Sequence, residues 1–116
     1  MAERSIREIF EDHLRNRANG DLDADLENNY AEDVVLLTCY GVFEGYDGVR
    51  ESEAILHRKV PNSTFDYVRK LDAKEMAFLE WTAKEDGVEV HDGVDSYLIR
   101  DGRIQVQTIH YTPVET

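Results

Sequence analysis

Apolar residues recur at helical spacing in the first part of the chain and at strand spacing in the second half. In the first segment they lie three or four positions apart, which predicts an amphipathic helix over residues 3–18. These residues are Ile6, Ile9, Phe10 and Leu14. A chain that begins with helices and continues as strands is typical of an α+β domain.

Two shorter helices and a series of strands are expected after this helix. Asp21 can cap the second helix, and Asp47 can cap the third, over roughly residues 49–59 before Pro61. Alternating apolar residues and turn signals predict strands over residues 34–40, 42–44, 64–71, 75–85, 88–100 and 103–112.

The dipeptide Asp101-Gly102 joins two long predicted strands and suits a type I′ hairpin turn, in which both central residues need positive φ. Strands this long in one domain of residues 1–116 must bend around the helices to bury both layers. The expected fold is therefore an α+β fold with a bent sheet. In it, the N-terminal helices pack in the concave face of a bent, mainly antiparallel sheet and leave a cavity beside the first helix.

The composition narrows the classes of partner. With 25 acidic and 13 basic residues the formal charge is −12, which argues against nucleic acid or an anionic membrane surface. No run approaches 18 apolar residues, so no membrane-spanning helix is predicted. Cys39 is the single cysteine, and it is expected to be a buried thiol in a cytoplasmic, reducing setting.

Recognisable metal and cofactor motifs are absent from the sequence. The histidines at positions 13, 57, 91 and 110 have no short ligand spacing of the H-x-x-x-H type. There is also no G-x-G-x-x-G, no P-loop and no G-x-S-x-G. We therefore expect neither a metal nor a cofactor, and any chemistry should come from side chains.

The order of three stretches resembles a known family: HLRNRANGDLDADLENNYAEDVVL, then FEGYDGVRESEAIL, then DSYLIRDGRIQVQTIHY. Together they resemble the nuclear transport factor 2-like superfamily, in the branch of SnoaL-like polyketide cyclases and ketosteroid isomerases. The resemblance runs from about residue 5 to residue 112 and implies a cone-like roll with a deep pocket, often as a homodimer. It does not fix a function, because the fold hosts isomerases, cyclases, dehydratases, hydrolases and binding modules.

The resemblance carries over to four positions with a mixed result. The oxyanion-hole tyrosine of ketosteroid isomerases falls at His13, and their protonated aspartic acid falls at Asp95. Their aspartate base falls at Thr38, which cannot shuttle a proton near neutral pH, so the steroid isomerase mechanism is not expected. A pocket aromatic on the last strand falls at Tyr111.

His13 and Asp95 are the candidate catalytic residues on sequence grounds as well. His13 follows the apolar stripe of the first helix, and Asp95 shares a strand face with Tyr97 by alternation. The alternatives are a half-exposed or core histidine and a surface carboxylate paired with arginine or lysine. Buried against apolar walls, Asp95 would favour its protonated form and could donate a hydrogen bond. We expect both side chains in one cavity, within direct or one-water reach.

The remaining pocket candidates are Tyr30, Thr38, Tyr97 and Tyr111, although a tyrosine in such a position is more often a simple core residue. Glu80 and Trp81 lie on opposite faces of their strand, and the pattern leaves open which one faces inward.

Three functional hypotheses follow. The first is a cofactor-free lyase, isomerase or hydrolase that acts on a small apolar substrate through a His13–Asp95 pair. The second is a pocket that binds a small ligand without turnover. The third is an interaction module that works as a dimer through its outer sheet surface. A homodimer joined through that surface is expected in any case.

Overall fold

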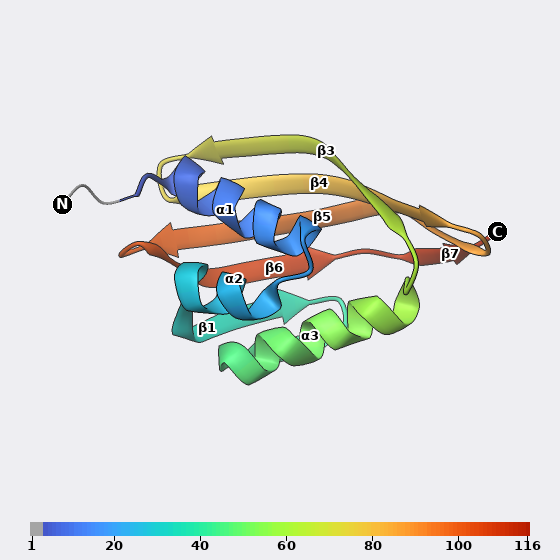
Figure 1. The fold of residues 1–116 in the computed structure, drawn as a ribbon, viewed down its shortest axis with the longest axis horizontal. Coiled ribbons are helices and arrows are strands. Elements are labelled where there is room, and N and C mark those ends of the chain that lie inside the picture. Colours follow the sequence, from blue (N-terminus) through green and yellow to red (C-terminus); the bar gives the residue numbers. More distant parts are fainter. Residues whose placement is uncertain (1–3) are drawn as a thin grey trace.

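The computed structural model describes residues 4–116 as three helices on one side of a seven-stranded sheet (Figure 1). The helices are α1 (Ile6–Ala18), α2 (Leu22–Asn29) and α3 (Gly45–Lys59). The strands are β1 (Tyr30–Thr38), β2 (Gly41–Glu44), β3 (Thr64–Ala73), β4 (Met76–Glu85), β5 (Val88–Arg100), β6 (Arg103–His110) and β7 (Pro113–Glu115). Residue 3, where the first helix was predicted to begin, lies outside the described residues.

The sheet has the order β2-β1-β6-β5-β4-β3, and β7 pairs with β5 beyond the end of β6. Only the β1–β6 pair is parallel, and the other pairs are antiparallel. Figure 1 shows β3, β4 and β5 curving past α1, with α3 lying along β1. The predicted α+β roll with a bent, mainly antiparallel sheet is confirmed.

Local capping fixes where the first two helices begin. Ser5 and Glu8 form a reciprocal capping box at the start of α1, and the Asp21 side chain accepts from the Ala24 N–H, as predicted for α2. The stripe of α1 buries Ile9, Phe10 and Leu14, while Ile6 is half-buried. No helix among the described residues is long and apolar enough to cross a membrane.

The prediction that Asp47 caps α3 is wrong. The helix already begins at Gly45, and its cap residue Glu44 makes no side-chain capping bond. Asp47 lies in the first turn instead, where its negative charge favours the helix dipole. Glycine is required at position 48 within this helix, because an added Cβ would lie 2.9 Å from the Phe43 backbone.

A bulge in β5 decides which side chains face the helices. Trp81 pairs with Gly93 but Ala83 pairs with Val90, so β5 has one residue more than β4 between these pairs. The face that carries Asp95 and Tyr97 therefore continues through Gly93 and then, across the bulge, through Val90. Across the sheet, Trp81 is buried on this inner face and Glu80 points outward, which the sequence left open.

The hairpin at Asp101-Gly102 is confirmed, because both residues have positive φ, 55° and 76°. The predicted end of the following strand at residue 112 is wrong, since β6 stops at His110 and a separate β7 follows. The Asp92 carboxylate accepts from both the backbone N–H and the hydroxyl of Thr112, each at 2.8 Å, and this fixes the break between the two strands.

The prediction that Cys39 is buried is also wrong. Cys39 follows the last residue of β1 and is exposed, with its thiol 3.5 Å from the Tyr111 carbonyl oxygen. An apolar run predicts burial only while the strand remains under the helices, and Cys39 lies in the turn beyond it.

Candidate functional site

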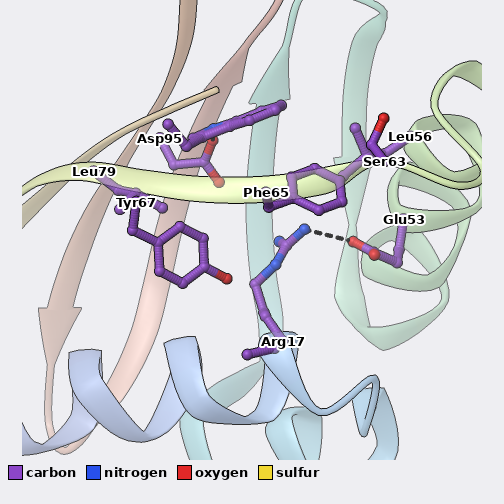
Figure 2. Close-up of a pocket in the computed structure, with 10 residues that line it drawn as sticks. Arg17, Glu53, Leu56, Ser63, Phe65, Tyr67, Leu79 and Asp95 are labelled. Atoms are coloured by element: carbon purple, nitrogen blue, oxygen red, sulfur yellow. Dashed lines mark hydrogen bonds and ion pairs between the residues drawn. The ribbon is translucent and has the colours of Figure 1, made fainter. Parts of the chain in front are cut away.

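A pocket of about 430 Å³ opens between the end of α1, α3 and the inner face of β3, β4 and β5 (Figure 2). Its walls are mainly aromatic and aliphatic. They include Leu56, Phe65, Tyr67, Leu79 and Trp81. The charged side chains that reach this pocket are Arg17, Glu53 and Asp95. An apolar chamber with a few converging polar groups is typical of a small-molecule site.

Asp95 lies at the inner end of the pocket with only 3% of its surface exposed. Two donors converge on its carboxylate, Trp81 Nε1 at 2.9 Å from Oδ1 and Gln107 Nε2 at 2.9 Å from Oδ2. The Tyr97 hydroxyl, which also contacts His13, lies 3.3 Å from Oδ2. A carboxylate has about four acceptor sites, so it accommodates these groups and keeps capacity for at least one more hydrogen bond.

Neighbouring groups fix the donors of Asp95. The Tyr30 hydroxyl donates to Gln107 Oε1, which leaves the Gln107 amide N–H₂ facing Asp95. The Trp81 indole packs over Gly93, where an added Cβ would lie 2.3 Å from the ring. Only glycine lets the indole come this close to β5, and this approach brings Nε1 to the carboxylate.

Arg17 and Tyr67 supply donors on the other side of the pocket. The Arg17 guanidinium forms an ion pair of 2.9 Å with Glu53, and Figure 2 shows the Tyr67 hydroxyl turned toward the Arg17 side chain. Burial lowers the pKa of Arg17, but the Glu53 and Asp95 carboxylates outweigh it and raise the pKa well above its usual value. Burial raises the pKa of Tyr67, so its phenol stays protonated and can donate.

His13 lies behind the pocket, fully buried between α2 and β5. Its Nδ1 is 2.8 Å from Asp25 Oδ2, and its Nε2 is 3.0 Å from the Tyr97 hydroxyl. That hydroxyl also contacts Asp95, so Tyr97 lies between the two predicted catalytic side chains and bridges them. The structure thus brings His13 and Asp95 into one hydrogen-bonded network without a direct contact.

The other predicted site residues lie in different places. Tyr30 and Tyr97 are buried beneath the pocket, where their hydroxyls belong to the network around Asp95. Tyr111 lines a separate small cavity of about 20 Å³, which shares Trp81 and Asp95 with the main pocket. Thr38 lies at the β1–β2 turn, where its hydroxyl donates to the Gly41 carbonyl at 3.0 Å, and is not in the pocket wall.

Comparison with known proteins decides the family. The family model described as the SnoaL-like domain matches residues 10–107. This chain belongs to the SnoaL-like domain family. None of the curated proteins matches it.

Solved structures share the fold of this SnoaL-like domain at low sequence identity. A nuclear transport factor 2-like protein of unknown function from Burkholderia xenovorans is 19% identical, with a TM-score of 0.73 over 92% of this chain and 82% of that chain. A protein from Mesorhizobium loti, proposed to be a SnoaL-like polyketide cyclase, is 17% identical, with a TM-score of 0.66 over 93% and 100%. TerC, co-crystallised with polyporic acid, is 14% identical, with a TM-score of 0.72 over 92% and 91%.

Sequence reasoning missed several residues of the SnoaL-like site, although some carried a signal. Asp25 and Asn29 lie at helical spacing within the apolar face of α2 and are almost fully buried, 1% and 0% exposed. A polar residue on an apolar helix face is such a signal. Arg17 continues the stripe of α1, four positions after His13. Gln107 carried no signal, because a strand pattern does not reveal which amide meets a carboxylate on the next strand.

Proposed function

We propose that this SnoaL-like domain binds a small apolar carbonyl compound and moves a proton on it, with Asp95 as the catalytic acid–base group. This is cofactor-free chemistry of the lyase or isomerase kind. The observation that carries the proposal is the Asp95 carboxylate, buried at the inner end of an apolar pocket with the Trp81 and Gln107 donors on it, the Tyr97 hydroxyl beside it and acceptor capacity left.

The chemical step uses groups on opposite sides of the pocket. Asp95 removes a proton from the carbon next to a carbonyl, so that a C–H bond breaks and an O–H bond forms on the carboxylate. The electron pair moves to the carbonyl oxygen, which becomes an enolate. Arg17 and Tyr67 face the pocket with N–H and O–H groups that stabilise this negative charge.

The charge balance of the pocket favours a neutral substrate. Two carboxylates, Asp95 and Glu53, face a single guanidinium, that of Arg17. An anionic substrate would have to displace Glu53 from Arg17 and approach Asp95 at the same time, which costs Coulomb energy in a partly buried site. A similar fold, that of TerC, was co-crystallised with a small organic molecule, polyporic acid.

The proposal is tested by hydrogen exchange. The protein is incubated in D₂O with 2-tetralone, acetophenone and acetylacetone, and loss of the α C–H signal is followed by proton NMR. We expect exchange above the buffer rate that saturates with the concentration of at least one ketone. A thermal-shift measurement with the same ketones separates binding from turnover. Stabilisation without exchange would favour the second hypothesis, a binding module without catalysis.

We also propose that the chain forms a homodimer through the sheet face that the helices leave uncovered (Figure 1). Residues opposite each other on paired strands share a face, so Leu37 shares this face with Val42, and Leu98 shares it with Met76. Leu37, Val42 and Met76 are 47%, 65% and 48% exposed, which is a large apolar exposure for an isolated chain.

Leu37→Glu should convert the dimer to a monomer, because it buries an unpaired charge in the proposed interface. Light scattering at high micromolar concentration measures the mass. Ala54→Glu adds the same charge to the exposed side of α3 and should leave the dimer intact. A monomeric mass for the unmodified chain would refute the proposal.

A further inference from the structure

We propose that the buried His13–Asp25 pair is a proton store for the pocket, reached from Asp95 through the Tyr97 hydroxyl. In this arrangement Asp25 is a positioning residue, which sets the protonation of the His13 ring without meeting the substrate. The inference rests on the proton transfer proposed above and extends it, because it says where the proton goes after Asp95 has taken it.

The geometry is an unbroken chain of contacts. Asp95 Oδ2 is 3.3 Å from the Tyr97 oxygen, the Tyr97 oxygen is 3.0 Å from His13 Nε2, and His13 Nδ1 is 2.8 Å from Asp25 Oδ2. The four side chains are 3% exposed or less, so within the described chain only the Asp95 end faces the pocket. A proton on His13 is therefore shielded from solvent.

The Tyr97 hydroxyl has one proton and two acceptors, so its direction depends on the charge of His13. When His13 is neutral with its proton on Nδ1, that proton is donated to Asp25 and Nε2 accepts from Tyr97. When His13 is an imidazolium, Nε2–H donates to Tyr97, and the Tyr97 proton turns to Asp95. The two states differ by one proton and use the same contacts.

The proton transfer follows from this change in the direction of the Tyr97 hydrogen bonds. After Asp95 has taken a proton from substrate carbon, the Tyr97 proton moves to His13 Nε2 and the Asp95 proton moves to the Tyr97 oxygen. One O–H bond breaks on each donor and one N–H and one O–H bond form, so no electron is gained or lost. The products are the Asp95 carboxylate, ready to accept again, and a His13 imidazolium next to Asp25.

Asp25 makes His13 able to accept. Its Oδ2 holds the Nδ1–H, and its Oδ1 accepts from Asn29 Nδ2 at 2.9 Å, an amide that also donates to Asp12. This fixes the tautomer whose Nε2 lone pair faces Tyr97, and it supplies the counter-charge that a buried imidazolium needs. Without the carboxylate, the ring proton could sit on Nε2 and close the path.

The groups around His13 come from every element packed against it. Asp25 faces it from α2, Tyr30 from β1, and Tyr97 and Asp95 from β5. Asp12 and Arg17 are the nearest charged residues of its own helix that join this network. Burial raises the pKa of Tyr30 and of Tyr97 well above the usual value, so both phenols stay neutral and the imidazole is the group that takes up charge.

The first experiment observes the His13 ring directly by two-bond proton–nitrogen NMR on the full chain labelled with ¹⁵N-histidine. We expect a protonated Nδ1 in neutral His13. Asp25→Asn should abolish this tautomer preference, because the Asp25 carboxylate is the group that accepts the Nδ1–H. The ring signals of the exposed His57 and His91 should be alike in both proteins. An unchanged His13 tautomer in Asp25→Asn would overturn the positioning role.

A double-mutant cycle tests the connection through Tyr97 and does not depend on Asp25→Asn being folded. Asp95→Asn should change the ¹⁵N chemical shifts of the His13 ring in the wild type and change them clearly less in Tyr97→Phe, since the hydroxyl carries the coupling. Tyr46→Phe is the control. It removes a hydroxyl that donates to the Tyr30 backbone carbonyl and is not part of the Asp95–Tyr97–His13–Asp25 contacts, so it should leave the cycle unchanged. If Asp95→Asn affects the His13 ring equally with and without the Tyr97 hydroxyl, the two residues are coupled only through space. That result would overturn the proposed proton store.

The two proposals fail in different ways. An intact cycle without any ketone exchange counts against the proposed reaction alone. Ketone exchange in a protein whose mutant cycle shows no coupling through Tyr97 counts against the proton store alone. Asp95 would then return its proton without the help of His13.

Discussion

Asp95→Asn is expected to lower kcat/KM for ketone hydrogen exchange by about 100- to 10,000-fold, the contribution of a general acid–base group. The amide cannot take up a proton in the accessible pH range. Its N–H₂ group would also face donors, because Trp81 and Gln107 both donate to the native carboxylate. The rate is measured by proton NMR in D₂O after thermal melting has shown that the variant is folded.

Two variants make this result specific. Asp66→Asn is the same substitution at an exposed position of β3 and should leave the rate near that of the wild type. Thr38→Ala should do the same, because Thr38 lies at the β1–β2 turn and its hydroxyl bonds only backbone groups there. A kcat/KM that does not change in Asp95→Asn would remove the catalytic role and leave the pocket as a binding site.

Gly93→Ala is expected to cost about 3 kcal/mol of unfolding free energy, at the upper end of the usual overpacking penalty. An added Cβ would lie 2.3 and 2.4 Å from two ring atoms of Trp81 and 2.6 Å from its backbone oxygen. The indole cannot move away without losing its bond to Asp95 and its packing against Phe65 and Tyr111. The loss is measured by urea unfolding and should lower Tm by roughly 10 °C.

Gly87→Ala is the matched control for this substitution. Gly87 has φ of 94° and open space where a Cβ would lie, so its replacement costs only the conformational penalty, about 1–2 kcal/mol. Gly93 has no positive φ, so the loss in Gly93→Ala comes from the contact with Trp81 and should exceed the loss in Gly87→Ala. Equal losses would show that the indole yields easily and that Gly93 is not required for its position.

The sequence predicted the elements whose signals are local. The stripe of α1, the Asp21 cap and the Asp101-Gly102 turn depend on residues within a few positions of each other. The errors arose where distant residues intervene. The start of α3 was misplaced because Gly48 reads as a turn signal, yet the close approach of Phe43 requires glycine there. The end of β6 was misplaced because Asp92, far away in the chain, binds Thr112.

For the candidate site, the sequence by itself determined that His13 lies on the buried stripe of α1 and that Asp95 shares the inner face of β5 with Tyr97, because periods of 3.6 and 2 fix side-chain direction. The tertiary structure alone decided what these side chains meet. The packing of α1 on the sheet sets the Tyr97 hydroxyl between them, the packing of α2 brings Asp25 to Nδ1, and the missing Cβ of Gly93 lets Trp81 reach Asp95. Such contacts join residues up to 84 positions apart, and no local periodicity encodes a distance between two elements.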